Sequence, residues 1–459
     1  MPPPRGADRA VRIAIVSAGV GAGHDGAAAG LARRLAEQGY RVDRHDFLDL
    51  LPAGAGRLLC GAYHRLLTWL PDGYQRLYAA TDEASRPGVV WRTLFRAAER
   101  RTLRALAPDT CAVVSTYPGA SQVLGALRGR GLLTVPAVTY LTDFSVHALW
   151  VAPGIDAHLA VHAVPAAQAH VRGAAAVSVA GPVTDPRFTP AAARQRAAAR
   201  DRFALPGETP LALLVAGSWG VGPVRRAAAE IRESGAAVPV VVCGRNEALA
   251  QRLRRDGVGH VFGWVDDMPG LMHACDVLVQ NAGGLTSLEA FAAGLPVASY
   301  RCIPGHGRTN AAALEEAGLA FWIRDPGDLG PALAGLLHGP RGRAQRTAGL
   351  TLHRTAPGPI PAITAARARV RATAGTGTGT GQGPAPQVRP VPEALPTSVP
   401  PVPPVPTATR FRGRRRLALT AATVTATVSL GIAAPLAHAY SETPARFTAV
   451  THYLDGDGR

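Results

Sequence analysis

Short apolar runs alternate with helix-like stretches from residue 11 to residue 299, and this alternation constrains the fold more than any other feature. The first run, residues 11–16, breaks into a glycine-rich turn and then into a helix-like stretch at residues 27–35. Strand, loop and helix in this order are typical of a parallel sheet with helices on both faces. We therefore expect a doubly wound α/β protein.

The predicted strands fall into two groups, separated by a pause at residues 181–206. The first group comprises residues 11–16, 40–47, 112–115, 135–141 and 157–161, and the second comprises residues 211–215, 238–242, 260–262, 277–279 and 296–299. Two open sheets in one chain leave a cleft between them, and such sheets bind ligands at the carboxyl ends of their strands. We predict one domain over residues 1–180 and a second over residues 181–365.

The rest of the chain has a different composition. Residues 373–409 are a low-complexity stretch of Gly-Thr and Pro-Val-Pro, and we assign residues 366–416 to a Pro/Gly/Thr-rich, basic linker. The apolar segment 417–439 follows five arginines and is long enough to span a bilayer. Its basic start and small-residue end also resemble a secretory signal, and a buried soluble helix is a third alternative. Residues 440–459 form a short tail.

Charge and cysteine content limit which partners the chain can have. A membrane span at residues 417–439 would keep the rest at the cytoplasmic face of the plasma membrane, because the arginines before it stay in the cytosol. The net charge of +17 is consistent with a solvated surface or with attraction to anionic lipid or phosphates. We expect no nucleic-acid partner, since no nucleic-acid motif uses this charge. Five scattered cysteines without a C-x-x-C pair give no basis for a zinc or redox centre.

The first glycine-rich loop, residues 17–26, lies between a predicted strand and a predicted helix. Free N–H groups at a helix start favour a negatively charged ligand. The helix dipole pushes His24 toward its neutral form, which suits a general base near pH 7. The alternative is a histidine that caps the helix or packs against it. This loop alone leaves both interpretations open.

A second polar segment begins at Thr142, directly after the predicted strand that ends at Leu141. Asp143 therefore lies at a strand's carboxyl end, where sites of this architecture gather. It is placed either to orient His24 or to take part in proton removal itself. The alternative is an aspartate that caps the next helix.

The third polar segment is the most specific. Gly283, Gly284, Thr286 and Ser287 open a predicted helix after a buried strand, which makes a seat for a diphosphate without any cation. Glu289 falls one turn into that helix and is placed to accept hydrogen bonds from a ribose hydroxyl pair. The alternative is a tight turn that binds nothing.

These segments and others resemble the monogalactosyldiacylglycerol synthase group of family 28 glycosyltransferases, over about residues 10–340. The matching pieces are residues 21–24 with Ala27 to Ala29, 45–47 with Pro52, 114–118, 142–144 with His147 and Trp150, 243–246, and 281–289. The resemblance implies the GT-B fold, in which two Rossmann-like domains face a cleft. It also implies an inverting hexosyltransferase that moves a sugar from a UDP-sugar to a diacylglycerol-like lipid acceptor at a membrane surface.

The resemblance assigns roles to single residues. It ties His24 to acceptor activation, with help from Asp143. The implied donor contacts are Gly217, Ser218, Gly244, Arg245, Met268, Asn281, Gly283, Gly284, Thr286 and Glu289. The implied acceptor contacts are Gly23, His147 and Trp150. The UDP-sugar is a substrate in this scheme, and no metal ion or other cofactor is expected.

Some positions depart from the group's pattern. Ala22 stands where a third consecutive glycine is usual, Tyr117 stands where His is commoner, and residues 305–310 replace a Pro-Gly-Gln-Glu block near the sugar. The identity of the sugar therefore stays open. Asp455 and Asp457 make an Asp-x-Asp pair in the terminal tail, a poor place for a metal site.

Three alternatives to a diacylglycerol glycosyltransferase remain at this point. The acceptor could be a polyprenyl lipid or a natural product. The scaffold could serve an epimerase or a hydrolase of sugar nucleotides. The chain could also be a non-catalytic, nucleotide-sugar-binding membrane protein.

Overall fold

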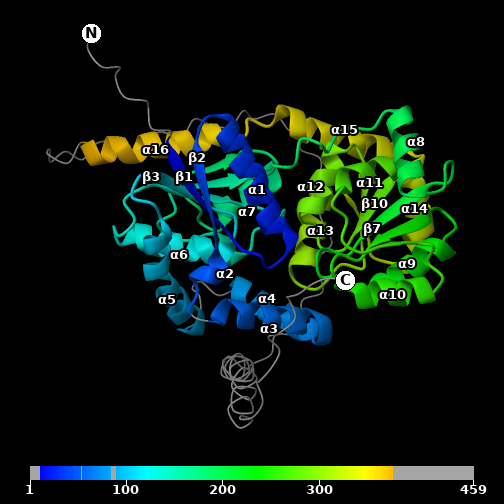
Figure 1. Ribbon diagram of the computed structural model, residues 1–459, viewed down its shortest axis with the longest axis horizontal. Coiled ribbons are helices and arrows are strands. Elements are labelled where there is room, and N and C mark those ends of the chain that lie inside the picture. The colour runs from blue at the N-terminus through cyan, green and yellow to red at the C-terminus, as the bar shows by residue number, and fades with distance from the viewer. Residues whose placement is uncertain (1–10, 53, 84–88, 376–459) are drawn as a thin grey trace, which may run out of the picture. The chain divides into compact units, whose positions relative to one another are not determined.

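The computed structural model describes residues 11–52, 54–83 and 89–375, which lie in one compact unit (Figure 1). Two six-stranded parallel sheets form the frame of this unit. The predicted apolar segment 417–439, the predicted tail 440–459 with Asp455 and Asp457, and most of the predicted linker lie outside the described residues.

The first sheet has the strand order β2-β1-β3-β4-β5-β6. Its strands are β1 (Arg12–Ser17), β2 (Arg41–Asp46), β3 (Thr110–Ser115), β4 (Ala137–Tyr140), β5 (Ala157–Ala160) and β6 (Val177–Val179). Ile13 and Ile15 of β1 are fully buried, because helices cover both faces of the sheet. A central parallel strand of this kind is a continuous apolar run and does not alternate with polar residues.

The first domain's helices surround this sheet. They are α1 (Ala22–Glu37), α2 (Phe47–Leu50), α3 (Ala55–Trp69), α4 (Pro71–Glu83), α5 (Val89–Ala105), α6 (Pro118–Gly129), the 3-10 helix η1 (Ala148–Trp150) and α7 (Ala163–Val171). Helices α2 to α5 occupy the long connection between β2 and β3. Figure 1 shows α3, α4 and α5 together along the lower edge of the view.

The second sheet has the strand order β12-β11-β10-β7-β8-β9. Its strands are β7 (Leu211–Val215), β8 (Val238–Val242), β9 (His260–Phe262), β10 (Val277–Gln280), β11 (Val297–Tyr300) and β12 (Phe321–Ile323). The helices of this domain are α8 (Ala193–Arg202), α9 (Val224–Glu233), α10 (Glu247–Arg255), α11 (Met268–Ala274), α12 (Leu285–Ala292), α13 (His306–Glu316), η2 (Pro326–Asp328), α14 (Leu329–Leu337) and α15 (Pro340–Thr355). The prediction of two doubly wound domains is confirmed.

The last described helix, α16 (Ile360–Gly375), returns from the second domain to the first, where it packs against β3 and β5. Ile363 and Ala366 are buried there. The linker predicted from residue 366 is therefore wrong for residues 366–375, which are helical. Ala and Arg are strong helix formers, and the buried Ala366 holds this stretch against the first domain. The low-complexity composition of the residues that follow made this helix hard to predict.

Candidate active site

Each sheet reverses its strand order at one place, and the loops with His24, Gly217 and Gly284 follow strands that flank those two places. In the first sheet β1 and β3 are neighbours, although β2 lies between them in the chain. In the second sheet β7 and β10 are neighbours in the same way. The loops that follow such strands leave in opposite directions and open a crevice at the sheet's carboxyl edge, where ligands bind.

The amino-terminal ends of α1 and α12 meet across the two domains. Gly26 of α1 lies directly against the Leu285 side chain of α12, and a Cβ atom at Gly26 would overlap it. Gly30 approaches Val183 of the interdomain connection just as closely, since a Cβ there would lie 2.8 Å from its side chain. The small residues of α1 thus let the two helix starts approach each other closely. Each of these starts has free backbone N–H groups.

His24 lies in the first turn of α1, as predicted. Its Nδ1 atom is 2.9 Å from the Thr142 hydroxyl, and its ring lies edge-on to Tyr117 at 5.3 Å between centroids. Burial lowers the pKa of His24, while the nearby Asp143 carboxylate offsets part of that effect. A backbone hydrogen bond at Thr116 also offsets part of the effect of burial. The pKa stays below its ordinary value, so the imidazole is neutral near pH 7.

Asp143 lies beside His24 but is held by another group. The Trp150 indole N–H donates to Asp143 Oδ2 at 3.1 Å. Trp150 is fully buried, 5.8 Å from the His24 ring between centroids. Its indole N–H is used by this bond and its ring packs against the histidine, so its role as an acceptor contact stays a prediction. The residue that orients the His24 ring through a hydrogen bond is Thr142, for which the sequence predicted no role.

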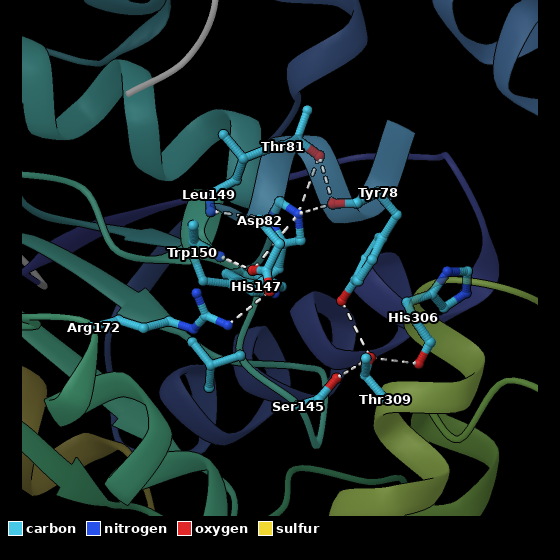
Figure 2. Close-up of polar contacts among 12 residues, drawn as sticks. Tyr78, Thr81, Asp82, Ser145, His147, Leu149, Trp150, Arg172, His306 and Thr309 are labelled. Carbon is cyan, nitrogen blue, oxygen red and sulfur yellow. Dashed lines mark hydrogen bonds and ion pairs between the residues drawn. The ribbon is translucent and has the colours of Figure 1, made fainter. Parts of the chain in front are cut away.

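His147 was predicted to contact the acceptor, and the structure places it in the interior (Figure 2). Its Nδ1 accepts from the Leu149 backbone N–H at 3.1 Å, so Nε2 carries the proton. Nε2 lies 3.2 Å from both the Thr81 hydroxyl and the Tyr78 carbonyl oxygen. Nδ1 thus caps η1, and Nε2 joins it to α4. The imidazole is buried and both of its nitrogens form hydrogen bonds within the chain, so its role as an acceptor contact stays a prediction.

Gly23, the third predicted acceptor contact, remains compatible with that role. It lies next to His24 in the first turn of α1, and a Cβ at this position would meet nothing within 4 Å. A ligand can therefore approach the backbone here.

At the start of α12 some polar groups are free and others already form hydrogen bonds. Gly284 caps the helix, and a Cβ there would meet no atom within 4 Å. Thr286, in the first turn, has no hydrogen-bond partner for its hydroxyl among the described residues. Gly283 differs, because its N–H already donates to the Gln280 side chain and its positive φ of 74° brings it against Asn310. The free donors for a diphosphate are thus at Gly284 to Thr286, and Gly283 supplies the turn.

The other predicted donor contacts lie in loops that pack on one another. Gly244, after β8, has a φ of +60°, and any Cβ there would overlap the carbonyl oxygens of Gly217 and Ser218 in the loop after β7. Arg245 donates its backbone N–H to the Ser218 carbonyl oxygen at 2.9 Å. Its guanidinium stacks over the exposed Trp264 ring, 4.5 Å from the centroid.

Asn281 and Met268 frame this loop cluster. The Asn281 side-chain amide donates to the Val221 carbonyl oxygen at 2.9 Å, which ties the loop after β10 to the loop after β7. This side chain is buried and braces the loops, and one of its two amide N–H groups is used in doing so. Met268 is the first residue of α11 and is partly buried.

Glu289 lies one turn into α12, partly buried and without a hydrogen-bond partner in the described residues. Burial, helped by the negative charge of Asp185, raises the pKa of Glu289 to about 8. Because no described residue donates a hydrogen bond to this carboxyl group, it is well suited to bind a ligand that carries hydroxyl donors.

The second domain adds His306, the first residue of α13, which sequence reasoning noted only as a departure. The Tyr74 hydroxyl of α4 lies 2.9 Å from His306 Nδ1. Burial lowers the pKa of His306, and both Asp143 and His24 act on its charge. Beside it, Thr309 bridges Tyr78 and Ser145 at 3.2 and 2.8 Å (Figure 2). No local pattern in the sequence signals these contacts, which join segments more than 160 residues apart.

Two kinds of feature are absent from the described residues. No group of three or more His, Cys, Asp or Glu side chains is arranged there to hold a metal ion. None of the helices described is long and apolar enough to cross a membrane.

Two family models match parts of the chain. Residues 24–181 match the family model of monogalactosyldiacylglycerol (MGDG) synthase, and residues 212–338 match glycosyl transferases group 1. A processive diacylglycerol beta-glucosyltransferase of Bacillus cereus (strain AH187) is 30% identical over 244 residues, which are 50% of this chain and 59% of the relative. The chain thus matches about three fifths of that relative's length.

Solved structures of distant sequence share the fold. Os79 from O. sativa, solved in complex with U2F and trichothecene, has a TM-score of 0.51 at 12% identity and covers 78% of this chain and 100% of its own. TcCGT1, solved in complex with UDP, has a TM-score of 0.50 at 9% identity over 79% of this chain and 99% of its own. The predicted resemblance to the monogalactosyldiacylglycerol synthase group and the predicted GT-B glycosyltransferase fold are confirmed.

Proposed function

We propose that this chain transfers a hexose from a UDP-sugar to the hydroxyl of a diacylglycerol-like lipid, with inversion at the anomeric carbon. One observation carries the proposal: the helix start that holds His24 and the helix start that offers free N–H groups at Gly284 to Thr286 meet at the crevice between the domains. The relative named as a processive diacylglycerol beta-glucosyltransferase supports this acceptor class, and glucose is the first sugar to test.

In this mechanism His24 acts as the general base. With its Nδ1–H donating to Thr142, the Nε2 lone pair accepts the proton of the acceptor hydroxyl. The acceptor oxygen forms a bond to the anomeric carbon while the bond from that carbon to the β-phosphate oxygen breaks, and UDP leaves with the electron pair. The base and the leaving group stand on opposite faces of the sugar, which inverts its configuration.

The start of α12 stabilises the leaving diphosphate. Backbone N–H groups and the positive end of a helix dipole act on the negative charge that grows on the β-phosphate, so a metal ion is not needed for this step. Glu289 accepts from the ribose hydroxyls, whose donation compensates its burial. Arg245, above Trp264 at the rim of the loops, adds a positive charge near the nucleotide.

We also infer that the protein works at the cytoplasmic face of the plasma membrane. The support is the run of five arginines that precedes the apolar segment 417–439. Cell fractionation followed by protease treatment of intact spheroplasts tests this placement, since a cytoplasmic catalytic body should be protected until the membrane is opened.

The experiment that tests the activity offers the purified full-length chain UDP-glucose and UDP-galactose separately, with diacylglycerol vesicles, and identifies the lipid product by mass spectrometry. A hexosyl-diacylglycerol that depends on His24 supports the proposal. UDP release that is the same with and without a lipid acceptor would point to hydrolysis and against transfer.

A further inference from the structure

A pocket with a volume of about 420 Å³ lies at the seam between the two domains. It is lined by the second half of α1, by the interdomain connection, by the end of α12 and by α15. Figure 1 shows α1 and α12 side by side, with α15 above them, and α12 contacts both of these helices. Pockets of about 300–1,000 Å³ are typical of sites that bind small molecules. We call this cavity the seam pocket.

The seam pocket is separate from the candidate active site. Between His24 at the start of α1 and Arg34 in the pocket, the helix rises about 15 Å. Between Gly284 at the start of α12 and Ala292 in the pocket, the rise is about 12 Å. A ligand in the seam pocket is therefore too far from the site to be the reacting sugar, but it contacts the same two helices.

Arginines from both domains line the seam pocket. Arg33 and Arg34 belong to α1, and Arg354 belongs to α15. Arg34 is half-buried, and no described residue forms an ion pair or a hydrogen bond with its guanidinium group. A partly buried charge without a partner is unfavourable, so this position favours an anion supplied by a ligand. Glu37, at the end of α1, is exposed, and water and salt screen its negative charge.

The other carboxylate of the seam pocket, Asp185, is already neutralised. Arg33 donates to Asp185 Oδ2 at 3.2 Å, and the Arg187 guanidinium donates to both carboxylate oxygens at 3.3 and 3.2 Å. Burial raises the pKa of Asp185, but the hydrogen bonds from Arg187 and the interaction with Arg33 outweigh it and lower the pKa to about 2. Asp185 therefore stays charged with both oxygens in use, and it leaves Arg34 and Arg354 to a ligand.

His353 of α15 adds an uncharged acceptor. Its Nε2–H donates to the Leu288 carbonyl oxygen at 2.9 Å, so Nδ1 carries a lone pair. Burial, helped by the positive charge of Arg34, lowers the pKa of His353 to about 4 against the opposing effect of the bond to Leu288, and the ring is neutral near pH 7. Phe188 and Leu350 supply apolar contacts. These groups together suit a small molecule with a phosphate, hydroxyl groups and a carbon skeleton.

The surroundings favour a soluble ligand over a lipid. None of the large apolar side chains that are strongly exposed in the described ranges lines the seam pocket. The acyl chains of a lipid need apolar surface to cover them, and this pocket offers such surface only inside its small volume.

We propose that the seam pocket binds a small, soluble, hydroxylated phosphate ester, with its phosphate on Arg34 and Arg354 and a hydroxyl group on His353 Nδ1. The ligand then joins α1 of the first domain to α15 of the second. It favours the arrangement in which the starts of α1 and α12 meet, and it raises the affinity for UDP at the start of α12. The effect on UDP rests on the proposed function, whereas binding rests on the charges and the shape of the seam pocket.

Equilibrium dialysis with radiolabelled glucose 6-phosphate tests the site. The purified full-length chain is saturated with UDP, which fills the diphosphate seat and keeps the probe out of it. We expect glucose 6-phosphate to bind at least about tenfold more tightly than glucose or inorganic phosphate, because glucose lacks the charge-assisted hydrogen bonds and phosphate lacks the hydroxylated body. Glucose or inorganic phosphate binding as tightly as glucose 6-phosphate would overturn the proposed ligand class.

Two variants tie the binding to the seam pocket. Arg354→Glu reverses a charge at an exposed position and should weaken binding of glucose 6-phosphate about tenfold or more. The matched control Arg255→Glu, at an exposed position of α10, should leave it unchanged. Arg34→Gln should also weaken binding about tenfold, and its melting temperature without ligand shows whether the fold is intact. Unchanged binding in Arg354→Glu would overturn the site.

Calorimetry of UDP with and without glucose 6-phosphate tests the coupling. We expect UDP to bind several-fold more tightly in its presence, and UDP should raise the affinity for glucose 6-phosphate by the same factor. Arg354→Glu should abolish both effects. Equal UDP affinity with and without glucose 6-phosphate would overturn the coupling. If UDP does not bind at all, the proposed function fails, while dialysis without UDP, compared between the unaltered chain and Arg354→Glu, still decides whether the seam pocket holds the phosphate ester.

Discussion

The His24 imidazole on α1 lies 2.9 Å from the hydroxyl of Thr142, which follows β4 and is 118 residues further along the chain. This contact engages Nδ1 and leaves Nε2 as the nitrogen that we propose takes the proton of the acceptor hydroxyl. A base whose tautomer and ring orientation are fixed before the substrate binds does not populate an unproductive rotamer.

Replacing Thr142 should therefore affect the chemical step. Thr142→Val keeps the shape of the side chain and removes the hydroxyl, and we expect kcat to fall about 10- to 100-fold, as for other residues that orient a catalytic histidine. The affinity for UDP, measured by calorimetry, should stay the same, because the donor loops are untouched. Thr142→Ser restores the hydroxyl and should recover most of the rate. A valine variant as fast as the unaltered chain would mean that Thr142 does not orient the base.

Asp143 should set the pH at which the base is active. Its negative charge raises the pKa of His24 against the larger effect of burial. Asp143→Asn removes that charge, so the pKa of His24 falls further and the base stays deprotonated to a lower pH. The acid limb of the kcat profile should move to lower pH. Asp49→Asn, at an exposed position, should leave the limb in place, and a shift of the Asp143→Asn limb to higher pH would contradict the assignment.

We expect Glu289 to lower the stability of the fold at high pH and to contribute to nucleotide binding. Its pKa is about 8 in the folded chain and near 4.5 when unfolded, so the folded state binds more protons between these values and loses stability as pH rises through them. Glu289→Gln should melt at the same temperature as the unaltered chain near pH 4 and about 3 °C or more above it at pH 9. Above pH 8, where the carboxyl group is charged, the same variant should bind UDP about tenfold more weakly, since a hydrogen bond to a charged acceptor is lost. Unchanged UDP affinity would remove the ribose assignment.

Glu230 should have the opposite pH dependence. Burial raises the pKa of Glu230, but hydrogen bonds from Arg301, Tyr300 and Arg226 outweigh it and lower the pKa to about 2. A lowered pKa stabilises the fold above pH 4.5 and ceases to do so as pH falls toward 2. Glu230→Gln should cost about 1–3 kcal/mol at pH 7, measured by urea unfolding, and the difference should shrink below pH 4. Glu233→Gln, exposed on the same helix, is the control and should cost little at either pH.

The two-sheet fold was predictable because its central strands are buried on both faces and therefore stand out as apolar runs. Residues 211–215 and 238–242 were predicted with the bounds of β7 and β8. The strands β6 and β12 were missed, since each has three residues at a sheet edge, and an edge strand needs no continuous apolar run.

The candidate site was predictable only where a motif sits on a single turn. His24 and Gly284 lie at helix starts that the local sequence defines. The acceptor roles of Trp150 and His147 stay predictions, and the burial of these two side chains depends on contacts with Asp143 and with α4 that the sequence pattern alone does not reveal. The contact of Tyr74 with His306 joins residues 232 apart in the chain, and only the packing of the two domains creates it.

The most direct test of the account is the rate of hexosyl-diacylglycerol formation from a UDP-hexose by the full-length chain and by His24→Ala, with UDP binding to each measured in parallel. The account predicts that the variant binds UDP normally and forms product at least about 100-fold more slowly, because general base catalysis contributes about 10²- to 10⁴-fold. Product formed by His24→Ala at the rate of the unaltered chain would contradict it.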